Sequence, residues 1–385
     1  MTTPNAAPEI TPEDLVLRVE SGTPFRLLDV RANTASGRID IVPEARYVNI
    51  RGSQVMAMGA DVRTAVPNGD PVAVVCERGN SSRQVAAHLI DLGYRAQSVK
   101  GGMAAWGMAV VARPLAPPPG FDLFIQFDRV AKGATGYLLG AGGEAVIVDP
   151  PRKAQPYLET ARDRGLKVVA VADTHAHADY ISGGPGVSRA LGVPYYLHPE
   201  DAILPYDGSP AKIEFQRADE GADIRVGGAS LRVVHTPGHT EGSVTYLAGT
   251  GAGTIALTGD FIFVNSIGRP DLGGKAEAWT KKLWTSLERA RGEWPAATRI
   301  YPAHYASDAE READRSVGRS FGEIQSRNEP VGMRDEGTFT AWVMKKVGGG
   351  PETYRRIKAV NLGLVEVWDM EAQELDIGKN ECALG

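Results

Sequence analysis

The chain has 385 residues, 43% of them hydrophobic and 23% charged, with a formal net charge of −5. This length predicts two domains. Because charges of both signs are spread along the chain, we expect no basic face that could bind a polyphosphate backbone, and a nucleic-acid partner is not expected. Residues 1–15 lack the charged and apolar regions of a secretory signal, and no apolar run approaches the roughly 20 residues that span a bilayer. Two cysteines are too few for a disulfide framework, so we expect a cytoplasmic protein that does not associate with membranes.

Before residue 113, short apolar runs alternate with helical patterns, in the order FRLLDV, VAVVC, QVAAHLIDLGY and AQSVKGG. Strands that alternate with helices predict a small parallel α/β sheet. The next stretch, RPLAPPPG, carries four prolines and cannot continue a helix or a central strand. We therefore expect a linker at this point.

Cys76 ends the apolar run VAVVC and precedes a glycine-containing turn and an amphipathic helix. Backbone N–H groups of such a turn, with the positive end of the helix, can hold an anion and lower the pKa of the thiol. A thiol with a lowered pKa in this position would act as a nucleophile and a sulfur carrier. The alternative is a small buried core residue, which is the commoner role of a cysteine at a strand end.

After the linker, the runs AVIVDP, KVVAVADT, SLRVVHT and TIALTGD are separated by glycine-rich turns. Several of these runs end at an aspartate or a histidine. Polar residues at the carboxyl ends of apolar strands lie where an α/β protein usually displays its site.

Two histidine motifs and one aspartate follow such runs. THAHADY contains His175, His177 and Asp179, HTPGHTEGS places His239 on a Pro-Gly turn, and TIALTGD puts Asp260 at a strand end. Residues i and i+2 of an extended backbone point the same way, so the first three side chains can converge. A single histidine at a strand end is usually capped or solvated, but four of the seven histidines lie in these two motifs. Imidazole and carboxylate from three strand ends predict a site for a first-row transition metal.

The motifs THAHADY, TPGHTEGS, LTGD and YPAH, in this order over about residues 121 to 310, resemble the metallo-β-lactamase superfamily. The resemblance implies an αββα sandwich. The first motif is normally His-x-His-x-Asp-His, and Tyr180 replaces its last histidine here. Members with two zinc ions use that histidine on the second metal, so the resemblance implies that a complete binuclear site is absent.

The remaining residues resemble the persulfide dioxygenases of this superfamily, which hold a single Fe(II) by two histidines and one aspartate. The resemblance implies one Fe(II) per chain at His175, His239 and Asp260, with His177, Asp179 and Tyr180 around these ligands. Such a set leaves positions open for O₂ and substrate, whereas a hydrolytic zinc site needs only one. Asp179 could orient a ligating imidazole.

The segment GDFIFVNSIGRPDLGG also matches the dioxygenases, and Arg269 in it could clamp a carboxylate of the thiol carrier. The alternative is that Arg269 pairs with Asp271 and only orders the loop. The segment 322–363 resembles the C-terminal part of dioxygenases that occur fused to sulfurtransferases. Cys382 lies either in a loosely ordered tail or near the iron.

Three stretches of the first domain, LLDVR, CERGNSSR and VKGGMAAW, resemble a rhodanese domain over about residues 10 to 112. The resemblance implies that Cys76 carries a sulfane sulfur. Rhodanese loops usually have an arginine five residues after the cysteine, where this chain has Ser81. Arg78 and Arg83 are then the candidates for the cation that binds substrate.

We therefore expect an α/β protein with a rhodanese-like domain at 1–113, a Pro-rich linker at 114–120, a metallo-β-lactamase-fold dioxygenase domain at 121–330 and a C-terminal extension at 331–385. The expected activity is oxidation of a low-molecular-weight thiol persulfide by O₂ to sulfite and thiol, coupled to sulfur transfer with thiosulfate or sulfite, in a homo-oligomer. Two alternatives stay open: a zinc thioester hydrolase of the glyoxalase II type, and a sulfur relay protein whose metal fold is a scaffold.

Overall fold

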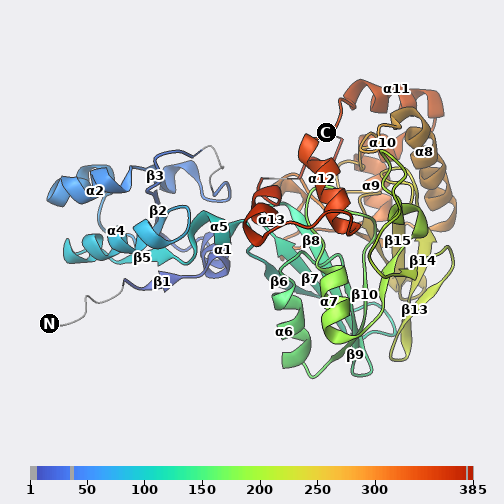
Figure 1. Cartoon of the computed structure of the whole chain (residues 1–385), viewed down its shortest axis with the longest axis horizontal. Coiled ribbons are helices and arrows are strands. Elements are labelled where there is room, and N and C mark those ends of the chain that lie inside the picture. Colours follow the sequence, from blue (N-terminus) through green and yellow to red (C-terminus); the bar gives the residue numbers. More distant parts are fainter. Residues whose placement is uncertain (1–6, 35–38, 379, 385) are drawn as a thin grey trace. The chain divides into compact units, whose positions relative to one another are not determined.

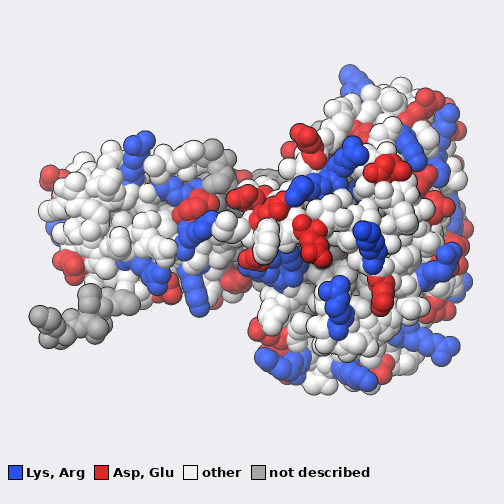
Figure 2. Space-filling model, viewed as in Figure 1, with Lys and Arg blue, Asp and Glu red and all other residues white. Residues whose placement is uncertain are grey.

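The computed structural model describes residues 7–34, 39–378 and 380–384 (Figure 1). The chain packs into two units, the first formed mainly by residues up to Val111 and the second by most of the chain from Ala112 onward. None of the helices formed by the described residues has the length and apolar character needed to cross a bilayer. On the face shown in Figure 2, acidic and basic side chains are interspersed.

The first unit is built on a parallel sheet in the order β1-β5-β4-β2-β3. The strands are β1 (Glu9–Ile10), β2 (Arg26–Asp29), β3 (Tyr47–Asn49), β4 (Val72–Val75) and β5 (Ala96–Val99). The helices are α1 (Pro12–Glu20), α2 (Gly52–Met58), α3 (Val62–Ala65), α4 (Asn80–Asp91) and α5 (Gly102–Trp106), with 3-10 turns at Glu44–Arg46 and Gly59–Asp61. The predicted parallel α/β sheet is confirmed.

Strand β4 is apolar on both faces, and helices cover both faces of the sheet. Its four residues, VAVV, are all buried. Val72 and Val74 pack with residues of α2 and α4, while Ala73 and Val75 pack with residues of α1 and α5. A continuous apolar run is typical of a central parallel strand between two helical layers.

The second unit contains two sheets. The first has the order β12-β11-β10-β9-β8-β7-β6, and the second has the order β13-β14-β15-β16-β17-β18. The first sheet comprises β6 (Val111–Leu115), β7 (Leu123–Arg129), β8 (Ala134–Ala141), β9 (Glu144–Val148), β10 (Lys167–Ala172), β11 (Tyr195–Leu197) and β12 (Gln216–Arg217). The second comprises β13 (Asp223–Val226), β14 (Ala229–His235), β15 (Val244–Ala248), β16 (Ile255–Gly259), β17 (Arg299–Pro302) and β18 (Arg319–Ser320).

The two sheets share one apolar core, in which Tyr137 and Val146 of the first sheet pack with Leu231, Tyr246 and Leu257 of the second. Helices α6 (Gln155–Asp163) and α7 (Gly184–Leu191) contact β10 of the first sheet. Helix α8 (Ala276–Glu293) packs against β16 and β17 of the second. The result is the expected αββα sandwich (Figure 1).

The chain after the sandwich is helical. It forms α9 (Phe321–Arg327), α10 (Glu329–Gly332), α11 (Glu336–Lys346), α12 (Glu352–Asn361) and α13 (Asp369–Leu375). Tyr354 and Ile357 of α12 pack with Ala178 and Phe263, which belong to loops that follow β10 and β16, and with Cys382. The C-terminal part of the chain therefore packs on the loops that carry the predicted metal ligands.

The predicted linker differs from the structure in its first residues. Residues 113–115 belong to β6, which is the outermost strand of its sheet. Pro114 is compatible with an edge strand because its missing N–H is not needed for pairing on the outer side. The prolines that follow this strand lie outside the strands and helices.

Candidate functional site

His175, His239 and Asp260 converge at the carboxyl ends of strands β10, β14 and β16. Asp260 Oδ2 lies 3.7 Å from His175 Nε2 and 3.3 Å from His239 Nε2. All three side chains are buried, and none of these three atoms has a hydrogen-bond partner among the described residues. Buried polar atoms are almost always satisfied, so three that face one another indicate a common ligand. Two imidazole nitrogens and a carboxylate oxygen fit a divalent transition metal.

Hydrogen bonds orient the two imidazoles. His239 donates through Nδ1–H to the carbonyl oxygen of Arg269 at 2.9 Å, which leaves the lone pair of Nε2 directed at the cluster. His175 Nδ1 lies 3.0 Å from Thr174 Oγ1, and that hydroxyl donates to Asp149. Burial lowers the pKa of both His175 and His239, which favours the neutral form that binds metals.

Two glycines allow the loops to approach this closely. Gly259, at φ +53°, would place a Cβ 2.4 Å from Thr174 Oγ1. A Cβ at Gly268 would lie 1.8 Å from the backbone oxygen of Asp260 and 3.0 Å from His239 Cβ. A side chain at either position would collide with the Thr174 side chain or with the Asp260 backbone, so these close approaches require glycine.

A second group of possible ligands lies beside the first. The ligand atoms of Asp179, His304 and Cys382 all lie within 4.8 Å of one another, and the three side chains are buried. His304 Nδ1 is 2.6 Å from Asp260 Oδ1, so the two groups are adjacent. Burial lowers the pKa of His304, but the charges of Asp179 and Asp260 outweigh it and raise this pKa to about 10.

His177 and Tyr180 form a third group. His177 Nε2 lies 3.1 Å from Asp149 Oδ1 and 2.9 Å from the Tyr180 hydroxyl. Asp149 has φ +51°, a strained conformation for a residue with a side chain, and Asp173 completes the group. Burial lowers the pKa of His177, but the charge and the hydrogen bond of Asp149 outweigh burial and raise this pKa. The Tyr180 hydroxyl is engaged with His177.

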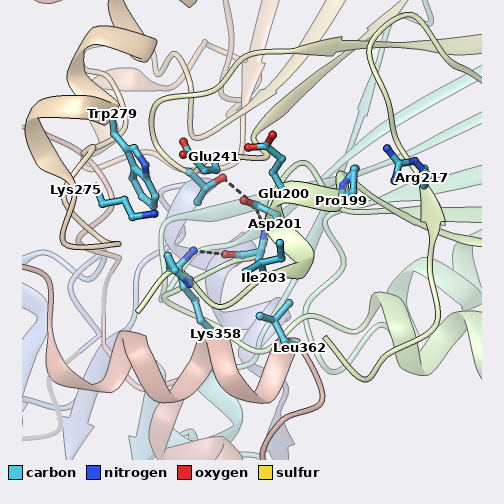
Figure 3. Close-up of a pocket in the computed structure, with 13 residues that line it drawn as sticks. Pro199, Glu200, Asp201, Ile203, Arg217, Glu241, Lys275, Trp279, Lys358 and Leu362 are labelled. Atoms are coloured by element: carbon cyan, nitrogen blue, oxygen red, sulfur yellow. Dashed lines mark hydrogen bonds between the residues drawn. The ribbon is translucent and has the colours of Figure 1, made fainter. Parts of the chain in front are cut away.

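A cavity of about 420 Å³ opens next to the metal-ligand loops. Ala176 and Thr240, which adjoin His175 and His239, line it together with Ile203, Trp279 and two lysines. Figure 3 shows one of these, Lys358, rising from helix α12, with Lys275 and Trp279 across the pocket. Lys358 is fully buried and donates to the carbonyl oxygen of Ala176 at 2.9 Å. A buried cation therefore faces the pocket beside the candidate metal site.

Arg269, the predicted clamp for a substrate carboxylate, pairs with Asp271 in the structure, and its role in substrate binding stays a prediction. Its guanidinium donates to both carboxylate oxygens of Asp271, at 2.6 and 2.8 Å, and to the carbonyl oxygens of Gly349 and Glu381. The alternative role, ordering the loop, agrees with these contacts. The bidentate pair occupies the fork that a substrate carboxylate would need.

In the first unit, Cys76 lies at the end of β4 within the loop that leads into α4. Gly79 donates its backbone N–H to Cys76 Sγ at 3.1 Å, and Ser82 Oγ lies 3.2 Å from the sulfur. Burial raises the pKa of the Cys76 thiol, but hydrogen bonds from Ser81 and Ser82 and from backbone N–H groups outweigh it, and the pKa is lowered. Ser81, at the position where rhodanese loops carry arginine, thus contacts the thiol.

The other two motifs of this domain support the cysteine loop. Gly102, at φ +63°, would place a Cβ 2.2 Å from the backbone oxygen of Cys76, and that oxygen accepts from Met103 N at 2.9 Å. In the LLDVR stretch, Asp29 and Arg31 form a buried ion pair of 2.6 Å. In the structure these two motifs make packing and ion-pair contacts within the first unit.

The two candidate cations differ in position. Arg78 is exposed, and its backbone N–H donates to the Cys76 sulfur. Arg83 donates to the carbonyl oxygen of Gly79 at 3.2 Å and to Asn80 Oδ1 at 3.0 Å, so it braces the loop from outside. The roles of Arg78 and Arg83 in substrate binding stay predictions.

Sequence reasoning missed three residues of the site. Asp149 ends the run AVIVDP, and that strand-end signal could have identified it. His304, in YPAH, served only to recognise the fold, although its motif is itself a strand end. Lys358 lies in a helix far along the chain, and nothing in its local sequence marks it.

Two family models match the chain. The metallo-beta-lactamase superfamily matches residues 131–315, and the rhodanese-like domain matches residues 11–109. The probable metallo-hydrolase YqgX of Bacillus subtilis is 31% identical over 184 residues, which are 44% of this chain and 84% of that protein. The human mitochondrial persulfide dioxygenase ETHE1 is 32% identical over 171 residues, which are 44% of this chain and 62% of ETHE1.

Solved structures agree with these matches. A metallo-beta-lactamase from Staphylococcus aureus subsp. aureus COL has 31% identity and a TM-score of 0.54, and the match covers 64% of this chain and 74% of that one. ETHE1 from Myxococcus xanthus has 23% identity and a TM-score of 0.52, with 63% of this chain and 99% of that chain covered, which supports the fold. This chain therefore belongs to the metallo-beta-lactamase superfamily and carries a rhodanese-like domain before the superfamily domain.

Proposed function

We propose that this protein is a persulfide dioxygenase that uses one Fe(II) held by His175, His239 and Asp260. The observation that carries the proposal is the convergence of three buried ligand atoms that lack hydrogen-bond partners among the described residues. Two imidazoles and one carboxylate are the ligand set of many non-haem Fe(II) oxygenases. The similarity to the human persulfide dioxygenase supports this choice.

The proposed reaction is R–S–SH + O₂ + H₂O → R–SH + SO₃²⁻ + 2 H⁺. Four electrons pass from the persulfide to O₂, and water supplies the third oxygen of sulfite. Bound iron would supply the one-electron chemistry that O₂ requires.

The cavity next to the ligand loops is the proposed binding site for the persulfide. Trp279 and Ile203 give it apolar walls, while Lys358 and Lys275 attract an anionic sulfur or a carboxylate of the carrier. The hydrogen bond from Lys358 to the Ala176 carbonyl holds that cation next to His175 and His177. The Arg269–Asp271 pair orders the loop whose carbonyl orients His239.

Cys76 is the proposed sulfur carrier of the rhodanese-like domain. Its thiolate attacks the sulfane sulfur of thiosulfate, so that an S–S bond forms on Cys76 as sulfite leaves. The Cys76 persulfide passes its sulfur to a thiol that becomes the dioxygenase substrate, or the domain runs in reverse and transfers sulfur to sulfite. Fusion of two sites in one chain raises the effective concentration of a shared intermediate.

The test is O₂ consumption by the iron-loaded full chain with a panel of persulfides, including those of glutathione and coenzyme A. We expect sulfite to form in equal amounts to the O₂ consumed, His239→Ala to abolish both, and Cys76→Ser to retain O₂ consumption when persulfide is supplied directly. Retention of full sulfur turnover in His239→Ala would favour a relay protein with a scaffold metal fold. Absence of O₂ consumption with every persulfide would overturn the proposal.

A second candidate is a zinc thioester hydrolase. The adjacent Asp179–His304–Cys382 group favours it, because paired metals about 3.5–4 Å apart serve hydrolysis. The similarity to a probable metallo-hydrolase points the same way. Thioester hydrolysis by zinc-loaded protein, without O₂ consumption by the iron-loaded form, would establish this function instead.

A further inference from the structure

The loop that follows β10 carries His175 but has no regular secondary structure of its own. Residues 173–181 lie outside the helices and strands, and all of them are buried. Buried backbone N–H and C=O groups need hydrogen-bond partners, and a loop without strand pairing finds many of them in side chains. The side chains that bind this loop therefore determine where His175 lies.

Asn361, at the end of α12, supplies three hydrogen bonds to the backbone of this loop. Its side-chain amide donates to the carbonyl oxygens of His177 at 2.9 Å and of Tyr180 at 3.0 Å. Its side-chain oxygen accepts from the backbone N–H of Ser182 at 2.9 Å. Asn361 is buried. One side chain from a distant helix thus ties together three positions of the loop.

Lys358 lies on the same face of α12, because residues three apart in a helix are neighbours. It donates to the carbonyl oxygen of Ala176 at 2.9 Å, so it also binds this loop. Lys358 lines the cavity of about 420 Å³, whereas Asn361 is not among the described residues that line it. Figure 3 shows Lys358 reaching from α12 toward that cavity. The two side chains therefore differ in function: Asn361 contacts the loop without facing the cavity.

We propose that Asn361 is a positioning residue for the metal site of the proposed dioxygenase. Its hydrogen bonds hold the loop in the arrangement in which His175 Nε2 lies 3.7 Å from Asp260 Oδ2. Without them the loop samples other conformations and has to be ordered when the metal binds, which weakens binding. This inference deepens the proposed function and rests on its metal site.

The substitution Asn361→Asp isolates the two donated hydrogen bonds, because aspartate has nearly the same shape but no N–H groups. Its carboxylate still accepts from Ser182, but it places a negative oxygen against two carbonyl oxygens. In the metal-free full chain we expect backbone amides of residues 176–182 to exchange with deuterium at least about tenfold faster than in the wild type. The affinity for Fe²⁺ and for Zn²⁺, measured by chelator competition, should fall at least about tenfold.

Asn328→Asp is the matched control. Asn328 is a buried asparagine of the C-terminal segment whose amide donates to the carbonyl oxygens of Phe263 and Ser266, in a different loop. Its replacement should leave exchange at residues 176–182 as in the wild type. Equal acceleration at these residues in both variants would reduce Asn361 to a general stabilising residue and overturn the proposal. Wild-type metal affinity in Asn361→Asp would overturn it as well.

A second variant, Asn361→Ala, guards against misfolding caused by the new charge and should show the same exchange and affinity changes. In iron-saturated protein it should lower kcat while KM for the persulfide stays within about twofold of the wild type, because Asn361 contacts the loop and not the cavity. A raised KM with unchanged kcat would contradict the positioning role. Absence of O₂ consumption by the wild type with every persulfide would remove the dioxygenase proposal, and exchange and metal affinity would still decide the role of Asn361.

Discussion

Ser82 is the residue whose replacement most directly tests the cysteine loop. It is fully buried, its hydroxyl lies 3.2 Å from Cys76 Sγ, and Ser98 Oγ holds that hydroxyl at 2.8 Å. In Ser82→Ala the thiolate loses a hydrogen bond, whereas the neutral thiol loses little. The pKa of Cys76 should therefore rise, and the thiolate should appear at higher pH than in the wild type.

The magnitude follows from the strength of a hydrogen bond to a charged group. Such a bond contributes about 1.5 kcal/mol at the lower end of its range, and this free energy corresponds to about a tenfold change in equilibrium. Below the pKa, Ser82→Ala should thus hold about tenfold less Cys76 thiolate. Each thiolate becomes about threefold more nucleophilic as its basicity rises, so the alkylation rate should fall only about three- to fourfold.

Both quantities can be measured on the full chain. Thiolate absorbance against pH reports the tenfold change, and iodoacetamide alkylation followed by peptide mass spectrometry separates the Cys76 adduct from that of Cys382. Ser53→Ala is the matched control, since Ser53 is an exposed serine of α2 in the same unit. A Cys76 titration in Ser82→Ala at the same or lower pH than in Ser53→Ala would refute the reasoning.

Three further substitutions test the packing around the sites. Gly102→Ala, at φ +63° and with its Cβ 2.2 Å from the Cys76 oxygen, should destabilise the first unit by about 2 kcal/mol or more, measured by denaturant unfolding; a stability equal to wild type would contradict the close approach. Gly268→Ala should lower iron affinity at least about tenfold in a chelator competition, whereas Gly186→Ala, with no atom within 4 Å, should leave it unchanged. Asp128→Ala leaves two buried arginines, which contact this carboxylate at 2.7 Å, without their partner, so unfolding should become easier by about 3–5 kcal/mol; a loss below about 1 kcal/mol would show that the network is solvated.

The ends of the strands, and the polar residues that stand there, could be predicted from local sequence alone. His175, His239 and Asp260 could be predicted because each directly follows an apolar run, and the carboxyl ends of such runs meet at one edge of a sandwich. Cys76 could be predicted for the same reason, with the glycine turn and helix after it. These signals are local, since periodicity and turn residues act over a few positions.

The residues that lie opposite these strand ends are brought there by packing between segments far apart in the sequence. Cys382 reaches Asp179 and His304, and Lys358 reaches Ala176, through packing of the C-terminal segment on distant loops. Arg269 pairs with Asp271 because the loop and the tail enclose both. No local pattern encodes such pairings, since the free energy that selects them comes from burial across the whole domain.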